Sequence, residues 1–288
     1  MISRKHYSGP LTDSRRWDAI PVRPDDVIVV TPPKSGTTWM QTIIALLLSG
    51  DPDVEPEVSF KMPWVDIRVR DIDEVAERLA AMSHRRSMKS HTPLDGLPIH
   101  DEAHYICVFR HPLDAHFSMR NHVRNIPIAI FDQWYADDAK TFRHFLDGTA
   151  DGEDCDAMPL LHIIQHFKAA KALSDRRNVT LFHYADMLRD LPGTFAKVAR
   201  LLETDYTQWE LDRLMEVATF DHMKQNAGRY APGGGAGFYK SDEAFFESGS
   251  LGKWQGALSD QEVAAYDRIM DANLSPEDRR WLEFGTAT

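Results

Sequence analysis

The sequence has few cysteines and no long apolar run, and each absence excludes a class of protein. Its 288 residues include two cysteines, Cys107 in an apolar run and Cys155 in an acidic loop, so a bridge between them is not expected. This usage favours a reducing, cytoplasmic compartment. The longest strongly apolar stretch, residues 43–48, is far shorter than the roughly 20 residues needed to span a bilayer. A membrane-spanning protein is therefore not expected.

The chain also lacks an excess of basic charge. Its net charge of −11 argues against a general nucleic-acid or anionic-membrane surface, since both need a basic surplus. Residues 1–24 carry charges but no continuous apolar segment, so no secretory signal is expected. A pocket can still be locally positive on an acidic protein, and a small anionic ligand is compatible with this composition.

Short apolar strands alternate with helical patterns along most of the chain. Residues 27–30 are β-branched and apolar on both faces, which predicts a buried parallel strand. Further strands are expected over 86–90, 104–109 and 179–184, and helices over 37–48, from 112 onward, and over 131–145, 160–173, 191–202, 211–217, 261–272 and 276–284. This order predicts an α/β fold. We expect a single domain over residues 1–288, with a central, mostly parallel sheet flanked by helices.

The turn after the first strand, residues 33–39, has the features of an anion-binding strand–loop–helix. Gly36 lets the backbone approach an anion, and free N–H groups at a helix N-terminus point toward it. Ser35, Thr37 and Thr38 add hydroxyl donors, and Lys34 adds a positive charge. A tight turn with a capping hydroxyl is the alternative. A standard ATP or GTP loop is excluded, because Lys34 stands two residues before the only glycine instead of directly after it.

Pro33-Lys34-Ser35-Gly36-Thr37-Thr38-Trp39 resembles the signature loop of the cytosolic-type sulfotransferases, which grip 3′-phosphoadenosine 5′-phosphosulfate (PAPS). Four further segments follow in that family's order, so the resemblance extends over residues 25–254. Residues 89–93 are similar to the family's Lys-x-His-x-Pro stretch, whose histidine is the catalytic base, and this implies that role for His91. Imidazole suits proton transfer near neutral pH, although a structural histidine is the alternative from the residues alone.

Two more segments imply the rest of the donor site. Residues 108–118 resemble the stretch whose arginine and serine hold the 3′-phosphate, which implies Arg110 and Ser118; an arginine can offer a bidentate fork there. Residues 182–187 resemble a strand ending in a tyrosine that contacts adenine. The adenine-side residues implied by the resemblance are Trp39, Tyr184, Thr219 and Phe220.

The fifth segment, residues 245–254, matches the family's Arg-Lys-Gly-x-x-Gly-x-Trp motif only in Gly249, Gly252 and Trp254. Glu247-Ser248 stand where the family has Arg-Lys, and each lost charge-assisted bond costs about 1.5–3 kcal/mol. Weaker binding of the 3′-phosphate is therefore expected unless Lys253 or Lys240 compensates. The Lys-x-x-x-Thr-Val-x-x-x-Glu dimer segment of many animal members is absent from residues 255–264, so dimerisation by that route is not expected.

The resemblance implies in-line transfer of a sulfuryl group from PAPS to a phenol or alcohol, with release of PAP (3′-phosphoadenosine 5′-phosphate) and without a metal. His91 would take the hydroxyl proton, and Lys34 would stabilise charge on the bridging oxygen. The small-molecule acceptor is expected near residues 63–65 and 131–135 and the glycine-rich loop 232–237, which is either a surface loop or a lid. A nucleoside-phosphate kinase and a non-catalytic PAPS or PAP sensor are the alternatives.

Overall fold

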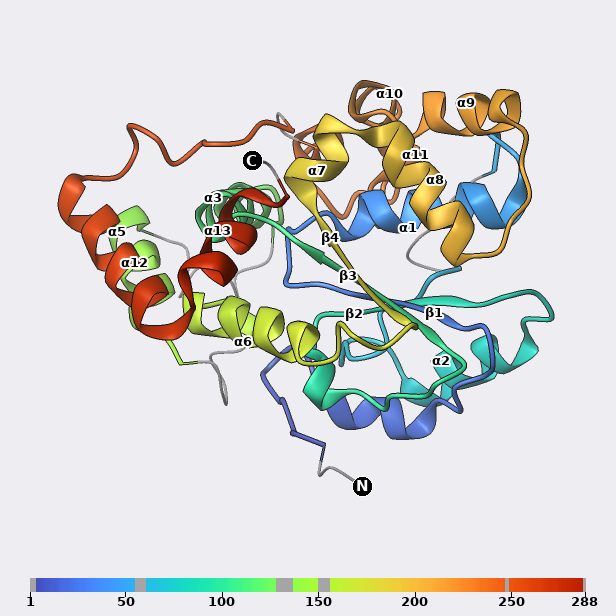
Figure 1. Ribbon diagram of the computed structural model, residues 1–288, viewed down its shortest axis with the longest axis horizontal. Coiled ribbons are helices and arrows are strands. Elements are labelled where there is room, and N and C mark those ends of the chain that lie inside the picture. Colours follow the sequence, from blue (N-terminus) through green and yellow to red (C-terminus); the bar gives the residue numbers. More distant parts are fainter. Residues whose placement is uncertain (1–3, 55–60, 128–136, 150–155, 247–248, 287–288) are drawn as a thin grey trace.

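The computed structural model describes residues 4–54, 61–127, 137–149, 156–246 and 249–286 (Figure 1). Its centre is a parallel sheet of four strands in the order β2-β1-β3-β4: β1 Val27–Val30, β2 Ser87–Ser90, β3 His104–Phe109 and β4 Val179–His183. The predicted α/β class with a parallel sheet is confirmed. The last strand ends one residue earlier than predicted, because Tyr184 already begins the next helix.

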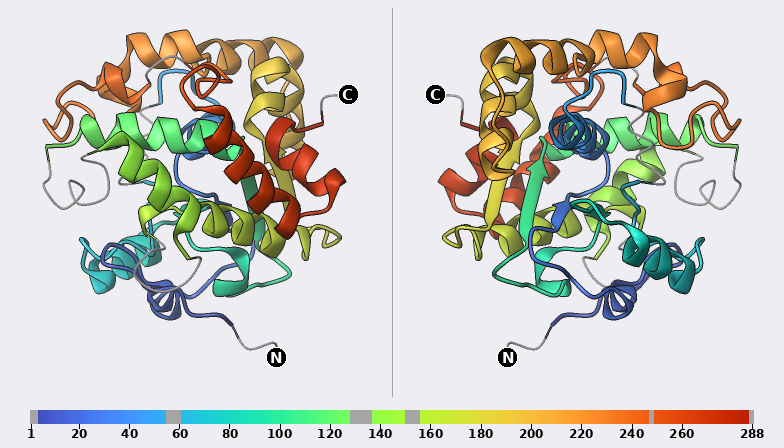
Figure 2. Two further views of the ribbon diagram at one scale, coloured as in Figure 1. Left: turned by 90° about the vertical axis from the view of Figure 1, so that its left-hand side faces the viewer. Right: turned by 90° about the vertical axis from the view of Figure 1, so that its right-hand side faces the viewer.

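Helices cover both faces of the sheet (Figure 2). Alternate residues of the strands belong to two separate hydrophobic clusters, one on each face. Val27 and Val29 of β1 pack against α1 (Thr37–Ser49), α8 (Leu191–Leu201) and α9 (Gln208–Val217). Ile28 and Val30 face the other layer, to which η1 (Ser14–Ala19), α2 (Ile72–Ala81), α6 (Leu160–Lys171), α12 (Asp260–Asn273) and α13 (Pro276–Phe284) contribute. Both faces of β1 are apolar because both are buried.

Five further helices complete the described part of the fold. They are α3 (Pro112–Arg124), α5 (Asp138–Asp147), α7 (Tyr184–Arg189), α10 (Phe220–Gln225) and α11 (Ala227–Tyr230), with short turns η2 (Leu94–Gly96) and η5 (Glu243–Phe245). Within the described ranges each helix is too short or too polar to cross a bilayer.

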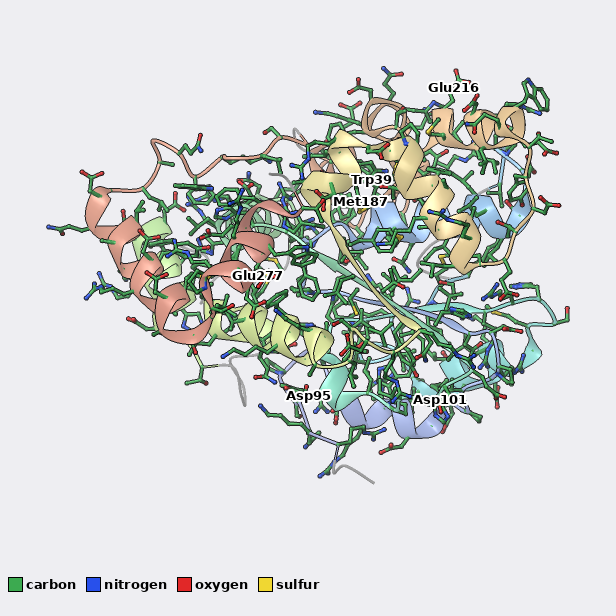
Figure 3. All side chains as sticks on the ribbon, in the orientation of Figure 1. Trp39, Asp95, Asp101, Met187, Glu216 and Glu277 are labelled. Carbon is green, nitrogen blue, oxygen red and sulfur yellow. The ribbon has the colours of Figure 1, made fainter. Side chains whose placement is uncertain are left out.

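Local capping explains where the structure departs from the predicted boundaries. α9 begins three residues before the predicted start, because Thr207 and Glu210 form a capping box at its N-terminus. α2 was not predicted; Asp71 caps it by accepting from the Asp73 and Glu74 backbone N–H groups. Two short elements that were not predicted, α11 and η5, lie on either side of the glycine-rich loop 232–237. Figure 3 shows Trp39 in the interior and Glu216 of α9 at the surface.

Candidate active site

A cavity of about 1030 Å³ lies at the carboxyl ends of the strands. It brings together most of the residues expected at the site: Lys34, Gly36, Thr37, Thr38, Trp39, His91, Arg110, Ser118, Tyr184, Phe220 and Gly249 all line it. Ser35 and Thr219 do not. Ser35 belongs to the loop, but it is fully buried. Thr219 caps α10, where its hydroxyl accepts from the His222 backbone N–H at 3.4 Å.

The loop between β1 and α1 has the backbone conformation that an anion cradle requires. Gly36 is the N-cap of α1 with φ 106°, and Lys34 also has a positive φ of 64°. No side chain caps the first turn of α1, so its N–H groups face the cavity side without a side-chain acceptor. The Ser35 hydroxyl oxygen is buried and has no hydrogen-bond partner within the described residues. Donors are therefore concentrated at this loop.

Gly36 also permits close packing against a residue from a distant strand end. A Cβ atom added at Gly36 would lie 2.9 Å from Cδ2 of Tyr184, nearer than real Cβ contacts allow. We expect Gly36→Ala to lower the free energy of unfolding by about 1–3 kcal/mol, through the left-handed φ and this clash. Urea unfolding measures the change. Gly237→Ala is the matched control, because Gly237 has φ 73° but nothing within 4 Å of an added Cβ. Equal losses in the two variants would exclude the clash.

The His91 side chain is fixed in orientation at the end of β2. Its Nδ1 lies 2.7 Å from the Thr31 carbonyl oxygen, which can only accept, so Nδ1 carries the proton and Nε2 keeps its lone pair. The ring meets Trp64 edge-on at 4.8 Å. Burial, together with the neighbouring charges of Lys89 and Lys34, lowers the pKa of His91 to about 3. The imidazole is therefore neutral in the free protein near neutral pH.

Asp66 accepts hydrogen bonds from the His91 backbone and from two tryptophan side chains. The carboxylate is fully buried and accepts hydrogen bonds from Trp17 Nε1 at 2.8 Å, Trp64 Nε1 at 2.9 Å and the His91 backbone N–H at 2.8 Å. Burial raises the pKa of Asp66, while these bonds to its oxygens oppose that shift. Sequence reasoning missed Asp66, since neither a motif nor a spacing marks an isolated aspartate.

Lys89 is a second residue whose role the sequence did not reveal. It lines the cavity with Nζ 4.9 Å from the centre of the Trp64 ring. Burial lowers its pKa to about 8. The available signal was its position on β2 two residues before His91, which directly follows the strand, since side chains at i and i+2 of extended backbone point to the same side.

Arg110 lies between the anion loop and the C-terminal segment. It is 5% exposed; its guanidinium donates to the Ser250 carbonyl oxygen at 3.1 Å and lies 4.5 Å from the centre of the Tyr184 ring. The Nε atom has no partner in the described part of the chain. The Lys34 ammonium lies 4.3 Å from the centre of the Phe245 ring. One cation on the loop and one beside it thus each lie against an aromatic ring.

Aromatic rings form another part of the cavity wall. Trp39 meets Tyr184 edge-on at 5.5 Å, and its indole N–H donates to the Ala218 carbonyl oxygen at 2.8 Å. Gly249 has φ 62°, and a Cβ added there would lie 2.8 Å from the Phe220 ring. The glycine is therefore required for the segment after residue 248 to approach Phe220.

Asp114 attaches that C-terminal segment to α3. Its carboxylate accepts from the backbone N–H groups of Gly252 and Lys253, both at 3.0 Å. Lys253 lines the cavity, whereas Lys240 donates to the Arg124 carbonyl oxygen and is not part of the cavity wall. Of the two predicted compensating cations, Lys253 is thus the one at the cavity. Glu247 and Ser248 lie outside the described residues.

The rest of the cavity has mostly apolar and aromatic walls. Of the expected acceptor segments, Trp64 and the loop residues Pro232, Gly233, Ala236 and Gly237 line it, while Pro63 and Val65 do not. Residues 131–135 lie outside the described residues. Further wall residues include Ile67, Val69, Phe238, Tyr239, Phe245 and Phe246.

Comparison with known proteins gives consistent matches along the whole chain. The profile of the sulfotransferase domain family matches residues 24–277. The glycolipid sulfotransferase of Mycobacterium tuberculosis is 32% identical, with 99% of this chain and 96% of that protein covered. The amine sulfotransferase of Oryctolagus cuniculus is 25% identical, with 90% and 84% covered.

Two solved structures have the same fold. A mouse sulfotransferase complexed with PAP gives a TM-score of 0.71 at 20% identity, covering 92% of this chain and 91% of that one. Retinol dehydratase in complex with androsterone and the inactive cofactor PAP also gives 0.71, at 22% identity, covering 93% and 88%. At these identities the likeness concerns the fold alone.

Proposed function

Since this chain belongs to the sulfotransferase domain family and is a sulfotransferase, we propose that it transfers a sulfuryl group from PAPS to the hydroxyl of a lipophilic acceptor, releasing PAP. The observation that carries the proposal is the shared cavity. One wall combines the anion loop with Arg110 and Ser118, and His91 presents an unprotonated Nε2 to the same space. A donor anion and a proton acceptor can thus meet there.

The described residues fit PAPS as the donor. Arg110 lines the cavity, and its buried Nε atom has no hydrogen-bond partner among the described residues. Gly36 and Gly249 stand where any side chain would clash with an aromatic ring of the site. PAPS would supply the sulfuryl group and a phosphate leaving group. Lys34 and the loop N–H groups would hold its 5′ end.

The remaining contacts to PAPS are of two kinds: polar and charged side chains for the 3′-phosphate, and aromatic rings for the purine. Arg110, Ser118 and Lys253 would hold the 3′-phosphate, with Lys253 replacing part of the positive charge that the family's Arg-Lys pair supplies. Trp39, Tyr184 and Phe220 offer aromatic surface for the purine. Two proteins of the same fold were solved with PAP bound, which supports PAP as the nucleotide product.

His91 would act as the general base. Its Nδ1 is held by the Thr31 carbonyl oxygen, which leaves Nε2 to take the proton of the acceptor hydroxyl. Burial, together with the charges of Lys89 and Lys34, keeps the ring unprotonated before the donor binds. A bound donor anion would offset those charges and raise the basicity of His91, so that the base is strongest when both substrates are present.

The acceptor is proposed to be a lipophilic alcohol. The acceptor side of the cavity has mostly apolar and aromatic walls. A relative at 32% identity is named a glycolipid sulfotransferase, and a protein of the same fold was solved with androsterone. The cytoplasmic location stays a prediction from the cysteine usage.

The test is a transfer assay with purified protein, PAPS and a panel of phenols, long-chain alcohols and alkyl glycosides. We expect PAP release together with a sulfate ester detected by mass spectrometry, with no requirement for added metal. Tight PAP binding without any sulfated product across the panel would contradict the proposal and favour the sensor alternative. Phosphoryl transfer from ATP with Mg²⁺ would favour the kinase.

The pH dependence of kcat/KM for PAPS provides a separate prediction. An ordinary histidine with a pKa of about 6.5 would be mostly protonated at pH 5.5, and activity would fall about tenfold. Since the pKa of His91 is lowered to about 3 in the free protein, the neutral base persists as the pH falls. We therefore expect no loss of kcat/KM around pH 6.5. Circular dichroism at each pH checks that the protein stays folded; an acid limb near 6.5 in folded protein would contradict the lowered pKa.

A further inference from the structure

A second histidine, His122, forms part of the cavity wall, and the transfer described above does not use it. It follows Ser118 by four residues on α3, so both side chains lie on one face of the helix. Its ring lies 5.8 Å from the Tyr239 ring and 5.6 Å from the Phe245 ring. The Lys34 ammonium lies 4.3 Å from the centre of the same Phe245 ring, and Lys34, Lys89 and His91 all interact electrostatically with His122, so His122 lies on the side of the cavity where transfer is proposed.

The imidazole of His122 has unused hydrogen-bonding capacity. Its Nδ1 is enclosed and has no hydrogen-bond partner among the described residues. Folded proteins satisfy nearly all enclosed polar atoms with protein groups, water or ligand, because an unsatisfied one is destabilising. A phenylalanine would fill the same space between Tyr239 and Phe245 without that cost. Because His122 also lines the cavity, a ligand bound there is a candidate for the missing partner.

The charge state of His122 determines which chemical groups it can bind. Burial, followed by the charges of Lys34 and Lys89 and by His91, lowers the pKa of His122 well below its ordinary value. The neutral ring has one N–H donor and one nitrogen acceptor. A hydroxyl group also donates and accepts, so it matches a neutral imidazole at either nitrogen, whereas an anion would need the protonated form.

We infer that His122 binds a second hydroxyl of the acceptor, next to the one that reacts at His91. The acceptor class is then a lipid-linked sugar or polyol instead of a simple alcohol. The surface end of the cavity suits the lipid part, because its wall residues Val69 and Phe238 are 73% and 44% exposed apolar side chains. This inference rests on the proposed function and names the substrate class of the same site.

Two acceptors with the same tail test it: octyl β-glucoside, which carries several hydroxyls, and 1-octanol, which carries one. We expect His122→Phe to lower kcat/KM for octyl β-glucoside about tenfold, the effect of one lost hydrogen bond in an enclosed site. The value for 1-octanol should not fall, and PAP affinity should not change. His122→Asn, which keeps a donor and an acceptor, should retain part of the activity on the glucoside.

His116→Phe is the matched control. His116 is on the same helix and also has a buried, unpartnered ring nitrogen, but it packs near Phe142 and Phe145 and is not part of the cavity wall. Its replacement should leave the ratio between the two acceptors unchanged. Equal losses on both acceptors, no loss on either, or weaker PAP binding in His122→Phe would overturn the inference. Wild-type turnover of 1-octanol without turnover of the glucoside would overturn it while the proposed function stands. Turnover of neither, nor of any acceptor in the panel, would overturn both.

Discussion

Replacing His91 with alanine is expected to lower kcat by a factor of about 10²–10⁴, the range that a positioned general base supplies. The Thr31 carbonyl oxygen fixes the Nδ1 proton of His91, so the lost atom is the free Nε2 that would accept the hydroxyl proton. PAP affinity should be retained, because His91 is not among the proposed donor contacts. Steady-state turnover with saturating PAPS and calorimetric titration with PAP measure the two quantities.

Chemical rescue sharpens this experiment. The alanine variant leaves space in the cavity wall, so added imidazole should restore part of its activity without stimulating the wild type. His84→Ala is a suitable control, since His84 is exposed, binds the neighbouring Arg85 carbonyl oxygen and is not part of the cavity wall. Near-normal turnover of His91→Ala would show that His91 is not the general base. Loss of PAP binding in parallel would instead indicate a structural defect.

The parts of the site that lie close together in the sequence were predictable. Val27–Val30, the turn and α1 follow one another directly, and the apolar strand, the glycine and the helix pattern are all local signals. The parallel sheet then places Arg110 near this loop, because β1 and β3 are neighbours and both end at the same edge. Sequence order and strand ends thus explain most of the residues that line the cavity.

The residues that hold the site in place were not predictable. Asp66 lies 25 residues before His91, and Asp114 lies 138 residues before Gly252, yet each bonds its partner directly. A buried carboxylate looks like a surface carboxylate in a sequence, since burial depends on tertiary packing. The exact role of Gly249 was likewise hidden, because its close approach to Phe220 joins two segments that meet only in the fold.

Replacing Lys34 with methionine is expected to lower kcat by a factor of about 10²–10³, the usual effect of losing one preorganised electrostatic contact to the transition state. The ammonium lies in the cavity, 4.3 Å from the centre of the Phe245 ring and on the loop proposed to hold the 5′ end of the donor. Methionine keeps an unbranched stem of similar length, so the packing against Phe245 is largely preserved while the charge is lost. Arginine should not restore full activity, because its planar fork differs in shape from an ammonium.

Comparison of kcat with PAPS affinity decides what Lys34 does. If it stabilises charge that develops on the bridging oxygen, kcat falls much more than PAPS affinity, because that charge is absent from bound PAPS and appears only as the sulfur–oxygen bond breaks. Lys240→Met is the matched control: it removes the same charge from a lysine that donates to the Arg124 carbonyl oxygen outside the cavity wall, and its kcat should not change. A Lys34→Met variant that loses PAPS affinity but keeps kcat would make Lys34 a binding residue only. The charge that assists departure of PAP would then have to come from Lys89, whose pKa of about 8 predicts a loss of kcat as the pH rises through that value.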